Sequence, residues 1–171
     1  EFISCALEQN LDIAATRKNY VDYLAHRPRV EKIGEHGLFT DEGEPVVLGQ
    51  VQNQVADHKG IVWTHVISLR REDAARLGYD SAVQWMALLR SKRAMLCKHM
   101  KIDSANLKWY AAFHNESHHP HVHLLVYSVK DGEGYLTKQS IEAMRSELAH
   151  DIFRQDFANI YEEQAQSRMD L

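Results

Sequence analysis

The sequence predicts an α+β fold in which helices pack on an antiparallel β-sheet. Three segments have the apolar composition or the alternation of strands, at residues 61–69, 107–114 and 121–129. Segments with apolar residues at helical spacing precede, separate and follow these strands. Because only a short connection joins the last two strands, we expect them to pair in antiparallel fashion.

The length and composition are those of one domain. The chain has 171 residues, of which 44% are hydrophobic and 26% charged, close to the average for globular domains. We expect residues 1–171 to form a single domain that is a fragment of a longer chain, because the sequence begins at Glu1 without Met and ends in a helical run. No apolar run or secretory signal is visible, which predicts a cytoplasmic protein without a membrane partner.

The first segments are expected to be helical. Residues 1–11 have a helical pattern, which suggests that no strand precedes the next helix. That helix spans residues 12–27, carries Tyr20 and Tyr23, and ends before Pro28, because a residue that precedes proline avoids the helical region. The two tyrosines are three positions apart, which is also the spacing of aromatic residues in a helix core.

The next segments alternate between loop, helix and strand. Residues 30–40 contain glycines and short apolar pairs, which predict a loop or small hairpin. Pro45 opens a helix over residues 46–58, and Gly60 closes it. The strand at 61–69 follows and is rich in β-branched and aromatic residues.

Two long helices complete the expected order of elements. The first runs from residue 82 to 100 after a cap at Asp80 or Ser81, and the second follows Thr137 as far as Ile160. The net charge of −4 argues against a wholly basic surface. Basic residues nevertheless gather on the first of these helices, at Arg90, Lys92, Arg93, Lys98 and Lys101. Such a face is more often solvated than bound to nucleic acid, and we expect little sequence specificity from it.

The most informative residues are the histidines between the two paired strands. His121 and His123 are two apart, so they project to the same side of a strand. His114 ends the preceding strand and is expected to face them across the turn. An isolated H-x-H pair is more often an ordinary surface feature, but a third histidine placed to converge favours a metal site. His118 and His119 lie in the loop and receive no ligand role.

Three neutral imidazoles form a typical site for a divalent first-row metal ion, and they leave coordination positions open. An open position can accept a phosphate oxygen, as in a catalytic rather than a structural site. Glu116 is a candidate to accept a hydrogen bond from the second ring nitrogen of one ligand.

The run H-N-E-S-H-H-P-H-V-H-L-L-V-Y, residues 114–127, resembles the third motif of Mob-type (MobA/MobL-like) plasmid mobilisation relaxases, which are HUH endonucleases. The resemblance implies that His114, His121 and His123 bind a divalent metal ion (Mg, Mn or Zn), with Glu116 at the acidic position of the motif. K-N-Y-V-D-Y-L-A-H-R, residues 18–27, also looks like the helix that carries the nucleophilic tyrosine in such relaxases.

That resemblance favours Tyr23, which Arg27 follows four residues later, over Tyr20 as the catalytic tyrosine. Residues 67–78 are similar to a segment of Clostridia-type mobilisation proteins. Together the resemblances imply an HUH relaxase fold and a site-specific nick in plasmid DNA, made by tyrosine attack on single-stranded DNA at an origin of transfer. They also imply accessory relaxosome proteins as partners. Arg27, Arg70 and Arg71 are the candidate contacts to the DNA backbone.

Four alternatives stay open at this point. The nucleophile is a tyrosine upstream of the fragment if the first strand is missing. The chain is a non-catalytic DNA-binding or relaxosome module if it binds metal without nicking. It is a metal-dependent hydrolase if activated water replaces the tyrosine, and a structural zinc site is the remaining option.

Overall fold

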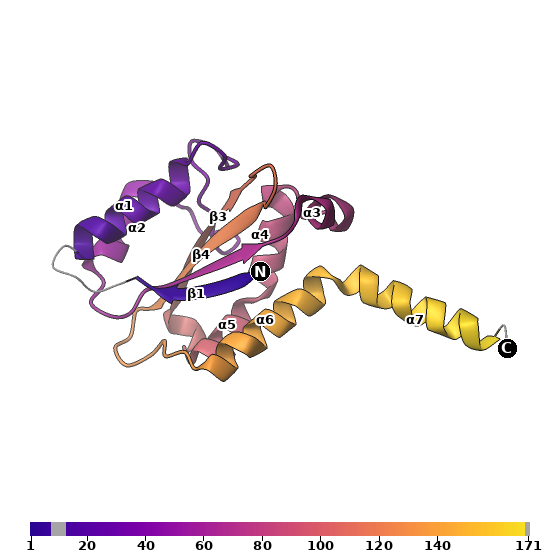
Figure 1. Ribbon diagram of the computed structural model, residues 1–171. Coiled ribbons are helices and arrows are strands. Elements are labelled where there is room, and N and C mark those ends of the chain that lie inside the picture. Colours follow the sequence, from indigo (N-terminus) through magenta and orange to yellow (C-terminus); the bar gives the residue numbers. More distant parts are fainter. Residues whose placement is uncertain (8–12, 170–171) are drawn as a thin grey trace.

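The computed structural model describes residues 1–7 and 13–169 and confirms the predicted α+β class (Figure 1). A four-stranded antiparallel sheet has the order β1-β2-β4-β3. Its strands are β1 (Phe2–Ala6), β2 (Trp63–Ser68), β3 (Leu107–His114) and β4 (His121–Ser128). The last two strands are those that the alternation of apolar residues predicted, and they form a hairpin.

Strand β1 corrects one prediction. The helical pattern of residues 1–11 is wrong for Phe2–Ala6, which pair with β2 in the register that places Cys5 opposite Thr64. A partner strand about sixty positions away outweighs the local pattern, because its ladder satisfies the backbone groups of β1. The rest of that prediction, residues 8–12, lies outside the described residues. A strand therefore precedes α1 (Ile13–His26), the helix that carries the two tyrosines.

Helices cover both faces of the sheet (Figure 1). On one face, α1 (Ile13–His26) and α2 (Leu48–Asp57) pack on side chains that include Tyr110 and Leu125. On the other face, α4 (Ala82–Ser91), α5 (Arg93–Met100) and α6 (Lys138–Ile152) enclose the larger core around Trp85 and Trp109. The short helices α3 (Arg71–Leu77) and η1 (Ser104–Asn106) complete the connections.

Both long helices of the prediction are interrupted. The predicted helix over 82–100 breaks at Lys92, whose N–H bonds the carbonyl of Leu89 three residues back and whose ammonium pairs with Asp151 of α6. The final helix divides after Phe153 into α6 and α7 (Arg154–Met169), which projects from the body and has no buried residue (Figure 1). Hydrophobic periodicity predicts neither break.

A buried arginine fixes α1 in place. Arg17 is 1% exposed, and its guanidinium donates to the carbonyls of Val55, His58 and Gly60 at the end of α2. A cation there satisfies carbonyls that the helix leaves unpaired and matches the negative end of its dipole. Helix α1, which carries the two tyrosines, is thereby held against the sheet.

The predicted loop at residues 30–40 lies along the outer edge of β3. Val30 forms an isolated bridge with His114, and Phe39 forms one with Ala111. Main-chain bonds thus partly cover an edge that would otherwise be open. Among the described residues, no helix has the length and apolar character that a membrane crossing requires.

Candidate metal centre

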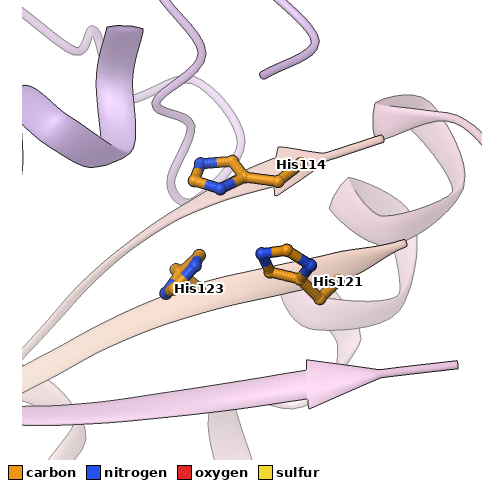
Figure 2. A group of neighbouring side chains, drawn as sticks. All are labelled: His114, His121 and His123. Atoms are coloured by element: carbon orange, nitrogen blue, oxygen red, sulfur yellow. The ribbon is translucent and has the colours of Figure 1, made fainter. Parts of the chain in front are cut away.

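Strand register brings the three predicted histidines together. His114 pairs with His121 across β3 and β4, and Ala112 pairs with His123, so all three imidazoles rise from one face of the sheet. Figure 2 shows the rings turned toward a common centre. One ring nitrogen from each lies within 4.8 Å of the others. The predicted convergence of the three side chains is therefore confirmed.

The turn between the two strands is held by an arginine. The Arg71 guanidinium donates to Asn115 Oδ1 at 2.7 Å, to the Ser117 carbonyl at 3.1 Å and to the Glu116 carbonyl. These bonds fix the connection that sets His114 against His121. Arg71, a candidate DNA contact in the sequence, thus also holds the turn.

The second ring nitrogens of two histidines are tied to main-chain carbonyls. His114 Nε2 lies 3.1 Å from the Leu24 carbonyl, and His121 Nδ1 lies 2.9 Å from the His119 carbonyl. Because a carbonyl only accepts, each of these nitrogens must carry the proton of a neutral ring. The opposite nitrogens, His114 Nδ1 and His121 Nε2, therefore offer lone pairs.

Buried nitrogens without partners support the fit of a metal ion. Among the described residues, His114 Nδ1 and His123 Nε2 are buried and make no hydrogen bond. Buried polar atoms are normally satisfied, so two orphaned imidazole nitrogens in one cluster indicate a missing ligand. Three imidazoles, two of them with tautomers fixed by main-chain carbonyls, are the donor set of a divalent first-row metal.

Burial lowers the pKa of two of the three rings, those of His114 and His123. Burial lowers the pKa of His114 to about 4, and its neighbours His121 and Arg27 act in the same direction. Burial and then the positive forms of His114 and His121 lower the pKa of His123 to about 3. Neutral imidazole is the form that binds metal, so both ligands are ready to bind at neutral pH.

The two tyrosines of α1 occupy different positions. Tyr23 is 42% exposed, its ring centroid lies 6.1 Å from those of His114 and His123, and its hydroxyl contacts the Arg27 guanidinium. Tyr20 points inward, with its hydroxyl 3.3 Å from His123 Nδ1. Burial raises the pKa of Tyr20 to about 12.

Glu116 and Arg70 are the remaining site residues predicted from the sequence. Glu116 lies 3.5 Å from the Arg27 guanidinium, while the second ring nitrogens of His114 and His121 are occupied by carbonyls. Glu116 therefore neutralises Arg27 in this structure and does not orient those two rings. Arg70 is exposed at the start of α3 and pairs with Asp73 at 3.5 Å.

Two contributions were absent from the sequence analysis. The carbonyls of Leu24 and His119 orient ligands, but main-chain atoms leave no mark in the sequence. The contact of the Tyr20 hydroxyl with His123 Nδ1 was also missed, because it depends on how α1 packs on the sheet.

Comparison with known families agrees with this geometry. The family model of the MobL relaxases matches residues 12–171, nearly the whole chain. No curated protein and no solved structure matches the sequence significantly. The family match spans α1 with its tyrosines, the histidine hairpin and the helices behind the sheet. The chain therefore belongs to the MobL relaxase family.

Proposed function

We propose that this relaxase nicks single-stranded DNA with Tyr23 as the nucleophile, and that His114, His121 and His123 hold a divalent metal ion against the scissile phosphate. The observation that carries the proposal is the cluster of ring nitrogens without partners beside the exposed Tyr23 ring. Membership of the relaxase family supplies the reaction class and the DNA substrate at an origin of transfer.

The chemistry is a transesterification. The Tyr23 oxygen forms a bond to phosphorus, the bond from phosphorus to the 3′-oxygen breaks, and the phenol proton ends on the released 3′-hydroxyl. The products are a 5′-phosphotyrosine and a free 3′ end, so no energy source is consumed. A metal ion at the three imidazoles would supply Lewis-acid stabilisation of the phosphate oxygens.

The residues of α1 orient the nucleophile. Tyr23 and Arg27 are one helical turn apart, and the Arg27 guanidinium contacts the Tyr23 hydroxyl and lies 5.1 Å from the ring centroid. Arg27 can thus hold the phenol oxygen and also face an incoming phosphate. Glu116 balances its charge from the β3–β4 turn. Arg70, on the exposed start of α3, is the better placed of the other two arginines for the DNA backbone.

Tyr20 fits the nucleophile's role less well. Its hydroxyl is turned toward His123, and its pKa is raised to about 12 by burial. An attacking oxygen must be accessible, and Tyr23 is the more exposed of the two tyrosines.

The test uses wild-type chain and single-stranded oligonucleotides carrying the origin of transfer of its element, with Mg²⁺ or Mn²⁺. Denaturing gels should show a covalent protein–DNA adduct that Tyr23→Phe abolishes, while the variant binds Mn²⁺ as the wild type does. Nicking without any adduct would support the metal-dependent hydrolase, because water attack leaves no protein bond. Metal binding without nicking would support the non-catalytic module. An adduct that persists in Tyr23→Phe would overturn the assignment of the nucleophile.

A further inference from the structure

Arg27 lies between the proposed nucleophile and a carboxylate. Its guanidinium contacts the Tyr23 hydroxyl on the same helix, and its Nε lies 3.5 Å from a carboxylate oxygen of Glu116 in the β3–β4 turn. A phosphate that Tyr23 attacks must come close to the same guanidinium, because Arg27 contacts the attacking oxygen. In the free chain, Glu116 is therefore paired with a cation that the DNA backbone also needs.

The pair between Arg27 and Glu116 can be exchanged at little cost. It is a single contact at 3.5 Å, and the two side chains are 33% and 29% exposed. Partly exposed ion pairs of this kind contribute little to stability. A phosphodiester oxygen accepts charge-assisted hydrogen bonds from a guanidinium, as a carboxylate oxygen does. A DNA phosphate can thus replace Glu116 as the partner of Arg27.

Main-chain bonds hold the turn and leave the Glu116 carboxylate free to move. The Glu116 N–H donates to the His114 carbonyl at 2.9 Å, and the Glu116 carbonyl accepts from the Arg71 guanidinium. Within residues 1–7 and 13–169, the carboxylate has no hydrogen bond or ion pair other than that with Arg27. The side chain can therefore turn away from Arg27 while the backbone of the turn stays in place.

The carboxylate also acts on the metal ligands while DNA is absent. Burial is the main cause of the low pKa of His114 and His123, and the positive charge of Arg27 lowers the pKa of both further. Glu116 acts in the opposite direction on the pKa of His114. Without an anion beside it, Arg27 would oppose the positive charge of a metal ion at these rings. A phosphate that replaced the carboxylate would preserve this balance.

We propose that the Glu116 carboxylate competes with a DNA phosphate for Arg27: it pairs with Arg27 in the free chain and releases it when a phosphodiester of the single strand enters. The inference rests on the proposed function and adds a step to the binding of its substrate. Glu116 acts through Arg27 and is therefore a positioning residue. A competing carboxylate weakens DNA binding, whereas a carboxylate that only fixed Arg27 in place would strengthen it, so the two roles predict opposite signs.

The experiment measures the binding of a fluorescent oligothymidylate by anisotropy with a chelator present, so that neither metal nor nicking contributes. Glu116→Gln keeps the size of the side chain and removes its charge, and it should bind about 3- to 5-fold more tightly than the wild type. In the Arg27→Ala background the same change should alter affinity by less than about 2-fold, because no cation is left to release. Glu162→Gln, which makes the same change of charge at an exposed position of α7, should bind as the wild type does.

Three outcomes overturn the competition. Weaker binding by Glu116→Gln would mean that the carboxylate fixes Arg27 for DNA. An equal gain in the Arg27→Ala background, or in Glu162→Gln, would reduce the effect to general charge repulsion. Equal affinity of the wild type and Glu116→Gln, including the case in which neither binds, would mean that Glu116 does not compete. The covalent-adduct assay is separate: a missing adduct overturns the proposed nicking, and the affinities measured with a chelator still decide the role of Glu116.

Discussion

The buried histidine of β2, His65, provides a test of the fold that does not involve the metal centre, because its protonation is linked to stability. Its side chain is fully buried, its ring stacks on Phe2 with centroids 5.5 Å apart, and its Nδ1 lies 2.7 Å from Ser4 Oγ. Its Nε2 has no partner among the described residues. Burial lowers the pKa of His65 to about 4, so the folded chain keeps this ring neutral far into the acid range.

The sign of the pH effect follows from linkage. Below pH 6.5 the unfolded chain takes up a proton at His65 that the folded chain refuses until about pH 4, so stability falls as pH falls through this window. The loss assigned to His65 is about 2 kcal/mol at pH 5 and approaches about 3 kcal/mol at lower pH. Above pH 6.5 the group contributes no pH dependence.

The assay is urea unfolding at pH 7.5 and pH 5, with a chelator present, for wild type and His65→Leu. The drop in unfolding free energy between the two pH values should be about 2 kcal/mol smaller in His65→Leu. Ile67→Val, a core change on the same face of β2 with no titrating group, should leave the drop as in the wild type. Equal drops in wild type and His65→Leu would refute the assignment of the acid sensitivity to this buried ring.

Three further predictions follow from named contacts. Arg71→Ala removes the bonds that hold the β3–β4 turn, so it should lower the unfolding free energy by about 2 kcal/mol in urea unfolding and weaken Mn²⁺ binding in calorimetry. Unchanged Mn²⁺ affinity would contradict the role of this turn. Arg27→Ala should slow adduct formation, measured on single-turnover gels, by about 100-fold and leave Mn²⁺ affinity unchanged. An unaltered rate would exclude Arg27 from the site. Arg90→Glu with Arg93→Glu breaks contacts to Thr40 and Asp41, so the double variant should be less stable and should keep the wild-type salt slope of oligonucleotide binding. A shallower slope would place DNA on α4 and α5.

The alternation of apolar residues with a period of two was sufficient to predict the β3–β4 hairpin that carries the three histidines. In residues 107–114 and 121–128 the pattern fixed both strand identity and the face of each side chain, so the convergence of three imidazoles followed from the sequence. Helix α1 and its end before Pro28 were also predicted from local sequence signals. These features depend on neighbours within a few residues, which is the range that periodicity describes.

The features that could not be predicted depend on distant partners. Strand β1 exists because Phe2–Ala6 meet β2, and the break at Lys92 accompanies a contact with Asp151 of α6. The bonds of Arg71 to the β3–β4 turn join residues 44 and 46 positions apart, so its neighbours in the sequence do not reveal them. The orientation of His114 and His121 by the carbonyls of Leu24 and His119 likewise requires the packed structure.

The central claim is that three imidazoles share one ion, and X-ray absorption of the zinc-loaded chain tests it most directly. The spectrum should show three imidazole nitrogens at about 2.0–2.1 Å from zinc, with one fewer in each of His114→Ala, His121→Ala and His123→Ala. A spectrum with no imidazole scattering, or one that none of these substitutions alters, would contradict the account.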